Sequence, residues 1–291
     1  MEKAIKRYWP VFVLPTLAAF IIGFVWPFLQ GLYLSFCRFI TIDKATFNGL
    51  TNYIYALTEA DFLHSFWFTA LFTVVSTLAI NIAALAIALA LTRGIKGTNL
   101  FRSVYFMPNL IGGIVLGYIW NILLNCVLTL LGKPLMSLHA PYGFIGLVIL
   151  MCWQQIGYMM IIYIAGLQSI PNDYLEAARI DGANDRQILW KVKLPNLMPS
   201  ITICLFLSLT NGFKLFDQNL ALTGGLPYII NPDGTTVHTT EMLALNIYNT
   251  FYGQNVNSRG VAQAKAVLFF ILVATIGLLQ LRSTRKKEVQ Q

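Results

Sequence analysis

Six long stretches of this chain contain no Asp, Glu, Lys or Arg, and they restrict its possible folds more than any other feature. A helix needs about 20 predominantly apolar residues to cross the hydrocarbon core of a bilayer. Backbone groups in that core must be paired within the protein, so spans that are not barrel strands are helical. The uncharged runs are residues 8–37, 66–92, 103–132, 134–172, 194–213 and 266–281.

The runs predict an all-α, polytopic membrane protein. The six transmembrane helices are expected near residues 10–36, 66–91, 103–124, 143–168, 196–216 and 261–281. The last is the weakest because Gln263 and Lys265 lie in its first turns. Composition agrees, since 57% of the residues are hydrophobic and only 11% are charged. Soluble domains contain about 45–50% apolar and about 25% charged residues.

The N-terminal run resembles a signal peptide only in part. Basic residues precede it, but it is longer than the roughly 7–15 residues of a signal-peptide core, and no small-residue cleavage site follows. We therefore expect a retained first helix, with its outer loop, over residues 1–65. A core transmembrane region is expected over 66–281, followed by a basic cytoplasmic tail over 282–291.

Lys and Arg are distributed unevenly among the segments between the spans. If the N-terminus is cytoplasmic, 14 of the 20 Lys and Arg residues fall in cytoplasmic segments. This is the bias of cell-membrane proteins, so both termini are predicted to be cytoplasmic. The net charge of +8 then reflects orientation rather than a nucleic-acid partner. The 14 residues are Lys3, Lys6, Arg7, Arg93, Lys96, Arg102, Arg179, Arg186, Lys191, Lys193, Arg282, Arg285, Lys286 and Lys287.

The sequence predicts no metal site and no cofactor bound by this chain. The four cysteines, Cys37, Cys126, Cys152 and Cys204, have no short spacing, so neither a metal site nor a disulfide framework is indicated. A phosphate-binding Gly-x-x-x-x-Gly-Lys-Ser/Thr motif is also absent from the sequence. If ATP drives this protein, a separate chain must bind it.

Residues 171–195 form a polar segment between the predicted fourth and fifth spans. Asp173 and Glu176 have the spacing of a capping box, which predicts a helix starting at Asp173 and running to about Asp181. Gly182 provides a left-handed turn, and Asn184 or Asp185 can cap a second short helix. Such a structured loop between spans is suited to docking another protein, although an ordinary interfacial loop is the alternative.

The loop also fits a family pattern: Glu-Ala-Ala, three residues, Gly, nine residues, an aliphatic residue, one residue, then Leu-Pro. It resembles the EAA loop of the permeases of ABC importers. Similarity to carbohydrate-type permeases extends along nearly the whole chain, for example through Trp153–Tyr158 and Thr223–Gly225, although Leu226 interrupts the usual Gly-Gly-Pro. The matching loop residues are Glu176, Ala177, Ala178, Gly182, Val192, Leu194 and Pro195.

The resemblance implies a type I ABC importer permease fold, of the maltose, raffinose, multiple-sugar and glycerol-3-phosphate subfamily. It implies a heterodimer with a second permease, two cytoplasmic ATPases that bind ATP and Mg²⁺, and an extracellular or periplasmic binding protein that delivers the solute. The coupling residues are expected to be Glu176, Ala177, Ala178, Asp181, Gly182, Leu194 and Pro195.

Polar side chains inside spans are costly and tend to face a bundle interior or a water-filled cavity. Hydroxyl and amide groups beside an aromatic ring suit a sugar, but hydrogen bonding between helices is the alternative role. Lys214 and Asp217, three residues apart, predict a local ion pair or an anchor for an acidic solute. The candidates for the solute path are Asn81, Gln154, Gln155, Tyr158, Ser208, Asn211 and Leu215.

Two other classes of membrane protein fit less well. An intramembrane enzyme needs His, Asp or Glu clustered in spans, but His64, His139 and His238 all lie outside the predicted spans. A self-contained secondary transporter most simply needs a coupling-ion carboxylate in a span, and the predicted spans contain none. The sequence therefore favours a non-catalytic permease subunit of an ATP-driven sugar importer that works by alternating access. Import of glycerol-3-phosphate or an acidic sugar is the alternative.

Overall fold

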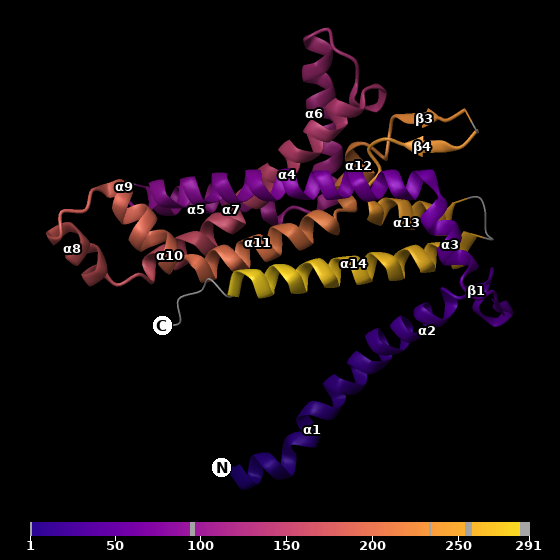
Figure 1. The fold of residues 1–291 in the computed structure, drawn as a ribbon, viewed down its shortest axis with the longest axis horizontal. Helices are drawn as coiled ribbons and strands as arrows, with labels where there is room; N and C mark the ends of the chain where they lie inside the picture. The colour runs from indigo at the N-terminus through magenta and orange to yellow at the C-terminus, as the bar shows by residue number, and fades with distance from the viewer. Residues whose placement is uncertain (1, 94–96, 233, 254–257, 286–291) are drawn as a thin grey trace. The chain divides into compact units, whose positions relative to one another are not determined.

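The structure is a computed structural model, and it describes residues 2–93, 97–232, 234–253 and 258–285. It divides into two compact units. The first unit contains Met1–Glu59 and Ile247–Phe270, and the second contains Ala60–Asn246 and Ile271–Gln291. Figure 1 shows that almost every labelled element is a helix. The predicted all-α architecture is therefore confirmed, and the described residues add four short strands in the loops.

The first unit consists of the N-terminal helices, a two-stranded sheet and parts of two later helices. Its sheet is antiparallel and pairs Cys37 with Phe47. The elements are α1 (Glu2–Phe20), the π turn η1 (Ile21–Val25), α2 (Trp26–Leu34), β1 (Cys37–Arg38), the 3-10 turn η2 (Ile42–Lys44), β2 (Thr46–Phe47) and α3 (Thr51–Thr58), with parts of α13 (Leu243–Tyr252) and α14 (Arg259–Arg285).

Polar contacts hold the first unit together. The buried Asn52 amide donates hydrogen bonds to the carbonyls of Ser35 and Cys37, both at 2.9 Å. The fully buried ammonium of Lys265, in the second turn of α14, lies 2.7 Å from the Glu59 carboxylate and 2.7 Å from the Thr250 hydroxyl. These contacts explain how a lysine can be fully buried in α14, because its charge is paired.

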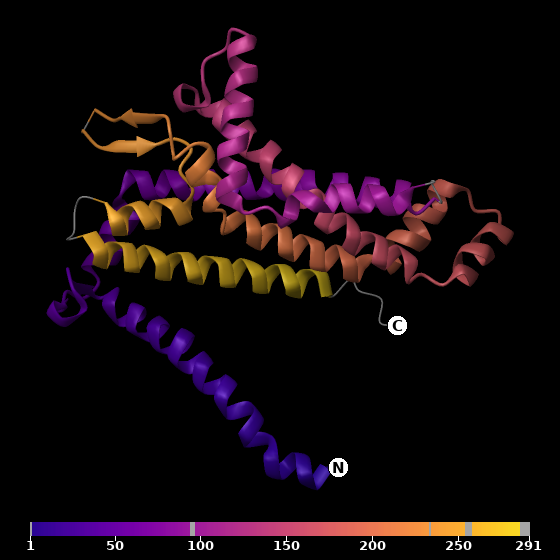
Figure 2. The same cartoon turned by 180° about the vertical axis from the view of Figure 1, so that it is seen from behind.

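The second unit contains the main helical bundle and its loops. In Figures 1 and 2, α4, α7 and α11 run side by side and α6 stands across them. The elements are α4 (Ala60–Leu91), α5 (Thr98–Phe106), η3 (Met107–Leu110), α6 (Gly113–Leu130), η4 (Met136–Leu138), α7 (Ala140–Gln168), α8 (Asn172–Ile180), α9 (Asp185–Ile188), η5 (Leu189–Lys193), α10 (Leu194–Asn196), α11 (Met198–Phe213), α12 (Asp217–Leu222), β3 (Tyr228–Ile230) and β4 (Thr236–His238).

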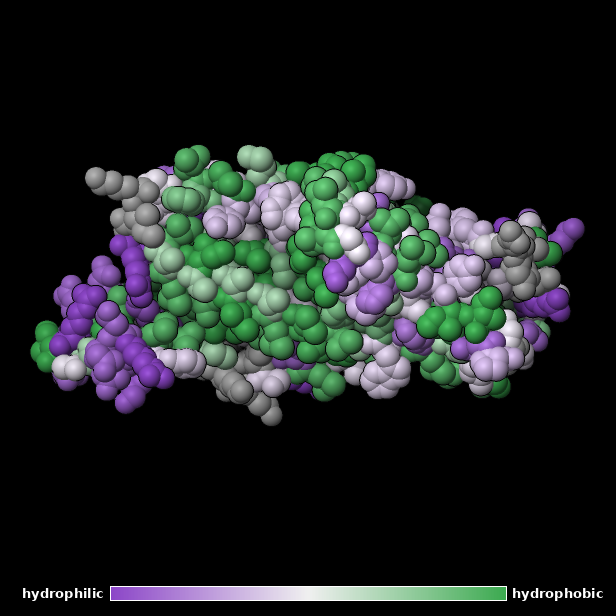
Figure 3. Space-filling view, turned by 90° about the horizontal axis from the view of Figure 1, so that it is seen from above, coloured by the Kyte–Doolittle hydropathy of each residue, from purple (hydrophilic) through white to green (hydrophobic). Residues whose placement is uncertain are grey.

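The core of this unit lies between α4, α7 and α11. A stripe of buried α4 residues recurs every four positions, which keeps it on one face of the helix. The stripe comprises Phe72, Ser76, Ile80, Ala84 and Ala88. Leu and Met side chains of α7 pack against it. The outward faces of α4 and α6 remain apolar and exposed, and Figure 3 shows the resulting broad hydrophobic surface.

The span prediction is largely confirmed. Among the described residues, five helices are long and apolar enough to cross a membrane, and a sixth span results if α9–α10 and α11 form one broken span. That pair is bent by 68° around Leu197. The sixth predicted span, which was the weakest, corresponds to Arg259–Ser283. The five helices are Val13–Leu34, Ala60–Leu91, Gly113–Leu130, Ala140–Gln168 and Arg259–Ser283.

The predicted third span, 103–124, is wrong at both ends. The chain forms α5, the 3-10 turn η3 and then a break before α6 begins at Gly113 and continues to Leu130. Pro108 lies within η3, and Gly112 adopts an extended conformation before α6. A charge-free run does not mark such breaks, because Pro and Gly are uncharged. Gly113 and Gly117 of α6 pack against Asp217 and Ala221 of α12, so these glycines allow two helices of this chain to approach closely.

The helix that corresponds to the predicted second span is α4. It begins at Ala60, six residues earlier than predicted, so His64 lies on this helix rather than in a loop. With 32 residues, α4 is about 48 Å long, well beyond the roughly 30 Å of a hydrocarbon core. Its first turns can therefore extend beyond the bilayer. The predicted division at residue 65 stays a prediction. Of the predicted tail, residues 282–285 belong to α14 and 286–291 lie outside the described residues.

Candidate functional site: the loop between the fourth and fifth spans and a polar cavity

The first helix of the loop, α8, begins at Asn172, and Pro171 is its N-cap. The predicted capping box at Asp173 and Glu176 is wrong, because no side chain caps this helix. Pro171 adopts a ψ of 136°, and the helix starts two residues too early for Asp173 to cap it. Spacing alone matched the motif, but the backbone around Pro171 determined where the helix began.

The turn at the end of α8 forms as predicted. Gly182 has a φ of +79°, a conformation that favours glycine. The Gly182 N–H bonds to the Arg179 carbonyl at 3.0 Å, and the Ala183 N–H bonds to the Ala178 carbonyl at 2.9 Å. These two bonds form a Schellman motif, which satisfies the last carbonyls of the helix. The loop therefore holds its two helices in a defined relation.

The second helix, α9, starts with a complete capping box. The Asn184 side chain accepts from the Gln187 N–H at 2.9 Å, and the Gln187 side chain accepts from the Asn184 N–H at 2.8 Å. The predicted capping role of Asn184 is confirmed. The chain then passes through η5 and α10, which contains Leu194 and Pro195, before the bend into α11.

The loop is anchored on one side and exposed on the other. Ile188 is 4% exposed, so it fixes the second helix to the bundle. Glu176, Ala177 and Asp181 are exposed. Ile180 is 86% exposed, an unusual state for an apolar side chain at the tip of a polar loop. Figure 3 shows hydrophilic residues gathered at this end of the molecule.

A second feature is a polar cavity of about 280 Å³ near the ends of α7 and α11. The Asn211 amide lies 3.5 Å from the Gln155 side-chain oxygen, and the Gln218 amide donates to Gln154 at 2.7 Å. Gln218 was not among the candidates, because it follows the predicted fifth span. The lining residues are Met151, Gln155, Asn211, Lys214, Leu215, Phe216, Asp217 and Gln218. Three candidates for the path thus meet in one cavity.

Asn81 and Ser208 occupy a different place. The Asn81 amide donates to the Ser208 hydroxyl at 2.7 Å, and its oxygen accepts from the Tyr163 hydroxyl at 2.7 Å. All three side chains are buried between α4, α7 and α11. This is the hydrogen bonding between helices that the sequence left as an alternative. Tyr163 was missed because a single tyrosine in an apolar run gives no signal.

The remaining candidates lie at the edge of the cavity region. Gln154 donates to the Ile111 carbonyl at 3.2 Å, which ties α7 to the break before α6. Tyr158 is half-buried, with its ring centroid 6.5 Å from that of Phe106. The predicted Lys214–Asp217 ion pair is wrong: in the part of the chain that the structure describes, neither residue has an oppositely charged group within 4.0 Å. Lys214 is exposed at the cavity.

A cluster of Asp61, His238 and Glu241 joins the β3–β4 hairpin to the start of α4. Asp61 accepts from the His238 N–H at 2.7 Å and lies 3.3 Å from His238 Nδ1. The Asn246 amide donates to Asp61 at 3.1 Å and to Glu241 at 2.8 Å. Potential ligand atoms lie within 4.8 Å of one another, but these hydrogen bonds already satisfy the carboxylates, so we assign no metal. The hydrogen bond to Asp61 raises the pKa of His238 above its ordinary value, and partial burial opposes the shift.

Residues 60–288 match the family described as the binding-protein-dependent transport system inner membrane component. The chain belongs to this family of multi-pass inner-membrane proteins, and it is the permease, or transport, subunit of an ABC importer rather than a catalytic subunit.

Its curated relatives match over nearly their full length. One is the probable starch degradation products transport system permease protein AmyD of Thermoanaerobacterium thermosulfurigenes, 42% identical, covering 97% of this chain and 95% of the relative. Another is the multiple sugar-binding transport system permease protein MsmF of Streptococcus mutans, 31% identical, covering 99% of each. A bacterial alginate ABC importer has a similar fold, with a TM-score of 0.80, 19% identity and 98% coverage of each chain.

Proposed function

We propose that this chain is the permease subunit of an importer for sugars or oligosaccharides, working by alternating access. The observation that supports it most directly is the loop around Gly182, held rigidly by a Schellman turn and a capping box yet exposed at its tip. The names of the two relatives, which refer to starch degradation products and multiple sugars, support the substrate class.

The complex we infer contains a second permease, two cytoplasmic ATPases and an extracellular or periplasmic binding protein. ATP and Mg²⁺ bind to the ATPases rather than to this chain. Membership of a binding-protein-dependent family supports this arrangement. The exposed apolar face of α6 offers a surface for lipid or for the second permease.

The 171–195 loop is proposed to dock the ATPase. Glu176, Ala177 and Asp181 present small and charged groups on the exposed side of α8, and Ala178 and Gly182 form the turn. Leu194 and Pro195 lie directly before the bend into α11. A movement of the docked loop would therefore be transmitted to α11, which carries Asn211 at its other end.

The solute path is proposed to pass the cavity lined by Gln155, Asn211 and Leu215. Amides and an apolar wall suit sugar hydroxyls and ring faces. Gln154 and Tyr158 stay in the proposal as neighbours of this cavity, and Gln218 joins them. Asn81 and Ser208 also belong to the proposed path, and in this structure their side chains are hydrogen-bonded to each other between helices.

Both termini are proposed to be cytoplasmic, because the Lys and Arg bias favours that orientation. Single cysteines at Gln290 and Asn231, in a chain whose native cysteines have been replaced, test it. An impermeant thiol reagent should label them from opposite sides of the membrane. Labelling of both from one side contradicts the orientation.

The substrate is tested by uptake into proteoliposomes that contain the whole importer and its binding protein. ATP-dependent accumulation of labelled maltotriose, without accumulation of glycerol-3-phosphate, supports the proposal. Accumulation of glycerol-3-phosphate alone contradicts it.

An acidic sugar or glycerol-3-phosphate is the second candidate, and Lys214 favours it. This ammonium is exposed at the cavity and has no carboxylate within 4.0 Å among the described residues. Lys214→Gln should abolish uptake if the solute is acidic, and it should leave neutral-sugar uptake nearly unchanged.

A further inference from the structure

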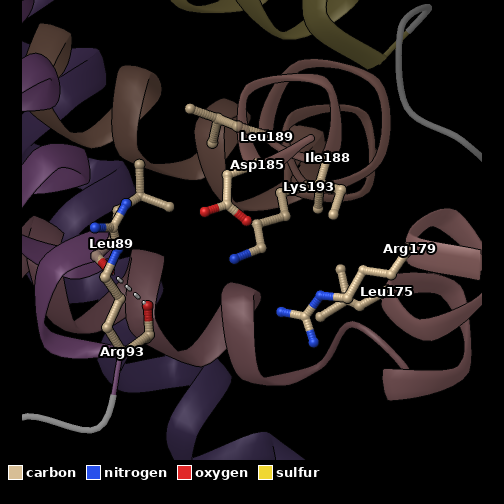
Figure 4. A pocket seen from close by; sticks show the side chains of 9 residues that line it. Leu89, Arg93, Leu175, Arg179, Asp185, Ile188, Leu189 and Lys193 are labelled. Carbon is tan, nitrogen blue, oxygen red and sulfur yellow. Dashed lines mark hydrogen bonds between the residues drawn. The ribbon is translucent and has the colours of Figure 1, made fainter. Parts of the chain in front are cut away.

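A basic cavity lies between the end of α4 and the two short helices of the coupling loop (Figure 4). Its volume is about 440 Å³. In Figure 4, the side chains of Arg179 and Lys193 reach toward its centre from two sides, and Arg93 stands at its edge. The three cations come from three different elements, α8, η5 and the turn after α4.

The positive charge of this cavity is largely uncompensated. Among the described residues that line the cavity, Asp185 is the one carboxylate, against the three cations. Over the ranges that the structure describes, none of the three cations has a carboxylate oxygen within 4.0 Å. Like charges gathered at one site repel one another, so a bound anion would stabilise the arrangement.

The wall beside these cations is apolar. Leu89, Leu175 and Ile188 line the cavity, and Leu89 belongs to the last turn of α4, a helix long enough to span a bilayer. A smaller cavity of about 280 Å³ shares Thr92, Leu175 and Lys193 with it. Cations beside an apolar wall at the end of a span match a phospholipid, whose phosphate adjoins its acyl chains. Basic pockets between helices on the cytoplasmic side of a membrane bind anionic headgroups.

We propose that this cavity binds the phosphate of an anionic phospholipid headgroup, with Arg93, Arg179 and Lys193 as its cationic contacts. The headgroup bridges the end of α4 to α8 and η5, and so holds the coupling loop against the bundle. The assignment to the inner leaflet rests on the proposed orientation, but binding itself does not depend on transport.

The test is phospholipid binding to the assembled importer, delipidated in a neutral detergent and titrated with phosphatidylglycerol. Native mass spectrometry counts the bound lipids. Replacing Arg93 and Lys193 together with Gln should weaken the tightest site about 30-fold, or roughly fivefold for each cation. The matched control replaces Arg186 and Lys191 with Gln, since both are exposed on the same segment and lie outside the cavity lining. It should change binding less than twofold. The charge-preserving pair Arg93→Lys and Lys193→Arg should retain the site.

Other results overturn the proposal. Equal losses in the cavity variant and the control indicate general surface charge. Phosphatidylcholine that binds as tightly as phosphatidylglycerol indicates an apolar site. If 10 mM inorganic phosphate displaces the lipid and also binds when no lipid is present, the cavity is a site for free phosphate. Failure of sugar uptake affects none of these readouts, so this proposal and the proposed function can fail separately.

Discussion

Two asparagines in the bundle illustrate how position decides the role of a residue type. The side-chain amide of Asn81 is engaged by neighbouring helices at both of its polar atoms: its nitrogen donates to Ser208 and its oxygen accepts from Tyr163. Asn211 has one long contact of 3.5 Å to Gln155 and lines a cavity. The first arrangement suits packing, and the second leaves hydrogen-bonding capacity for a solute.

Because of this difference, replacing asparagine with leucine should impair transport at position 211 and stability at position 81. Asn211→Leu should lower sugar uptake about fivefold through loss of a solute contact, while the thermal stability of the importer stays near that of the wild type. Asn81→Leu should lower stability by about 1–3 kcal/mol, because it leaves the buried Tyr163 hydroxyl without its acceptor. Proteoliposome uptake and thermal unfolding measure the two effects. If Asn211→Leu transports normally, the path runs along another face.

The ion pair of Lys265 and Glu59 gives a second prediction at this scale. Glu59→Gln leaves the fully buried ammonium without its counter-charge, which costs about 3–5 kcal/mol when such a pair is broken. Replacing both residues, with Glu59→Leu and Lys265→Met, removes the charge and should restore most of the stability. The melting temperature of the purified importer distinguishes them. A double variant as unstable as the single one contradicts the pairing account.

Among the elements, the β3–β4 hairpin is connected to α4 by a titratable group. The imidazole of His238 faces Asp61 from α4 and Glu241 from its own segment, and the ring of Tyr228 on β3 lies 6.3 Å from its centroid. His64, on the same helix as Asp61, also interacts electrostatically with Asp61. Protonation of His238 therefore strengthens the connection between hairpin and helix.

The pH dependence has a definite sign. Because the folded pKa of His238 is raised, its stabilisation is fully present below the unfolded value of about 6.5 and is lost as pH rises through the folded pKa. The melting temperature of the wild type should exceed that of His238→Gln by more at pH 6 than at pH 9. A difference that is constant over this range contradicts the account.

Sequence patterns located most of the elements, but they did not locate breaks or caps reliably. Charge-free runs found the spans because lipid excludes charge, and they failed over 103–124, where Pro108 and Gly112 interrupt a run that carries no charge. The correct cap at Asn184 and the wrong one at Asp173 share the same spacing, with Gln or Glu three residues later. They differ in backbone conformation, which depends on Pro171 rather than on the motif.

On the scale of the whole molecule, the 171–195 loop, which is proposed to dock the ATPase, is connected to a polar cavity through one bent helix. The loop could be predicted because its motif is continuous in sequence, from Glu176 to Pro195. The cavity could be predicted only in part, because Gln155, Asn211 and Gln218 come from three helices and meet through packing. The sequence did not indicate that Arg93, Arg179 and Lys193 would lie together, beyond the excess of Lys and Arg in the segments predicted to be cytoplasmic.

The central claim is that the 171–195 loop couples ATP hydrolysis to transport. Two glycines permit a matched comparison, since Gly182 and Gly132 both have positive φ, of 79° and 66°. Each N–H also bonds to a carbonyl three residues earlier at 3.0 Å. Proline cannot adopt either conformation, so both substitutions distort a turn to a similar degree.

The decisive measurement is ATP-dependent sugar accumulation per ATP hydrolysed, in proteoliposomes containing the assembled importer. Gly182→Pro should assemble and hydrolyse ATP but lose accumulation by at least about tenfold, because the loop no longer transmits closure of the ATPases. Gly132→Pro should accumulate sugar as the wild type does. Equal accumulation per ATP in the wild type and Gly182→Pro, with both fully assembled, would contradict the account.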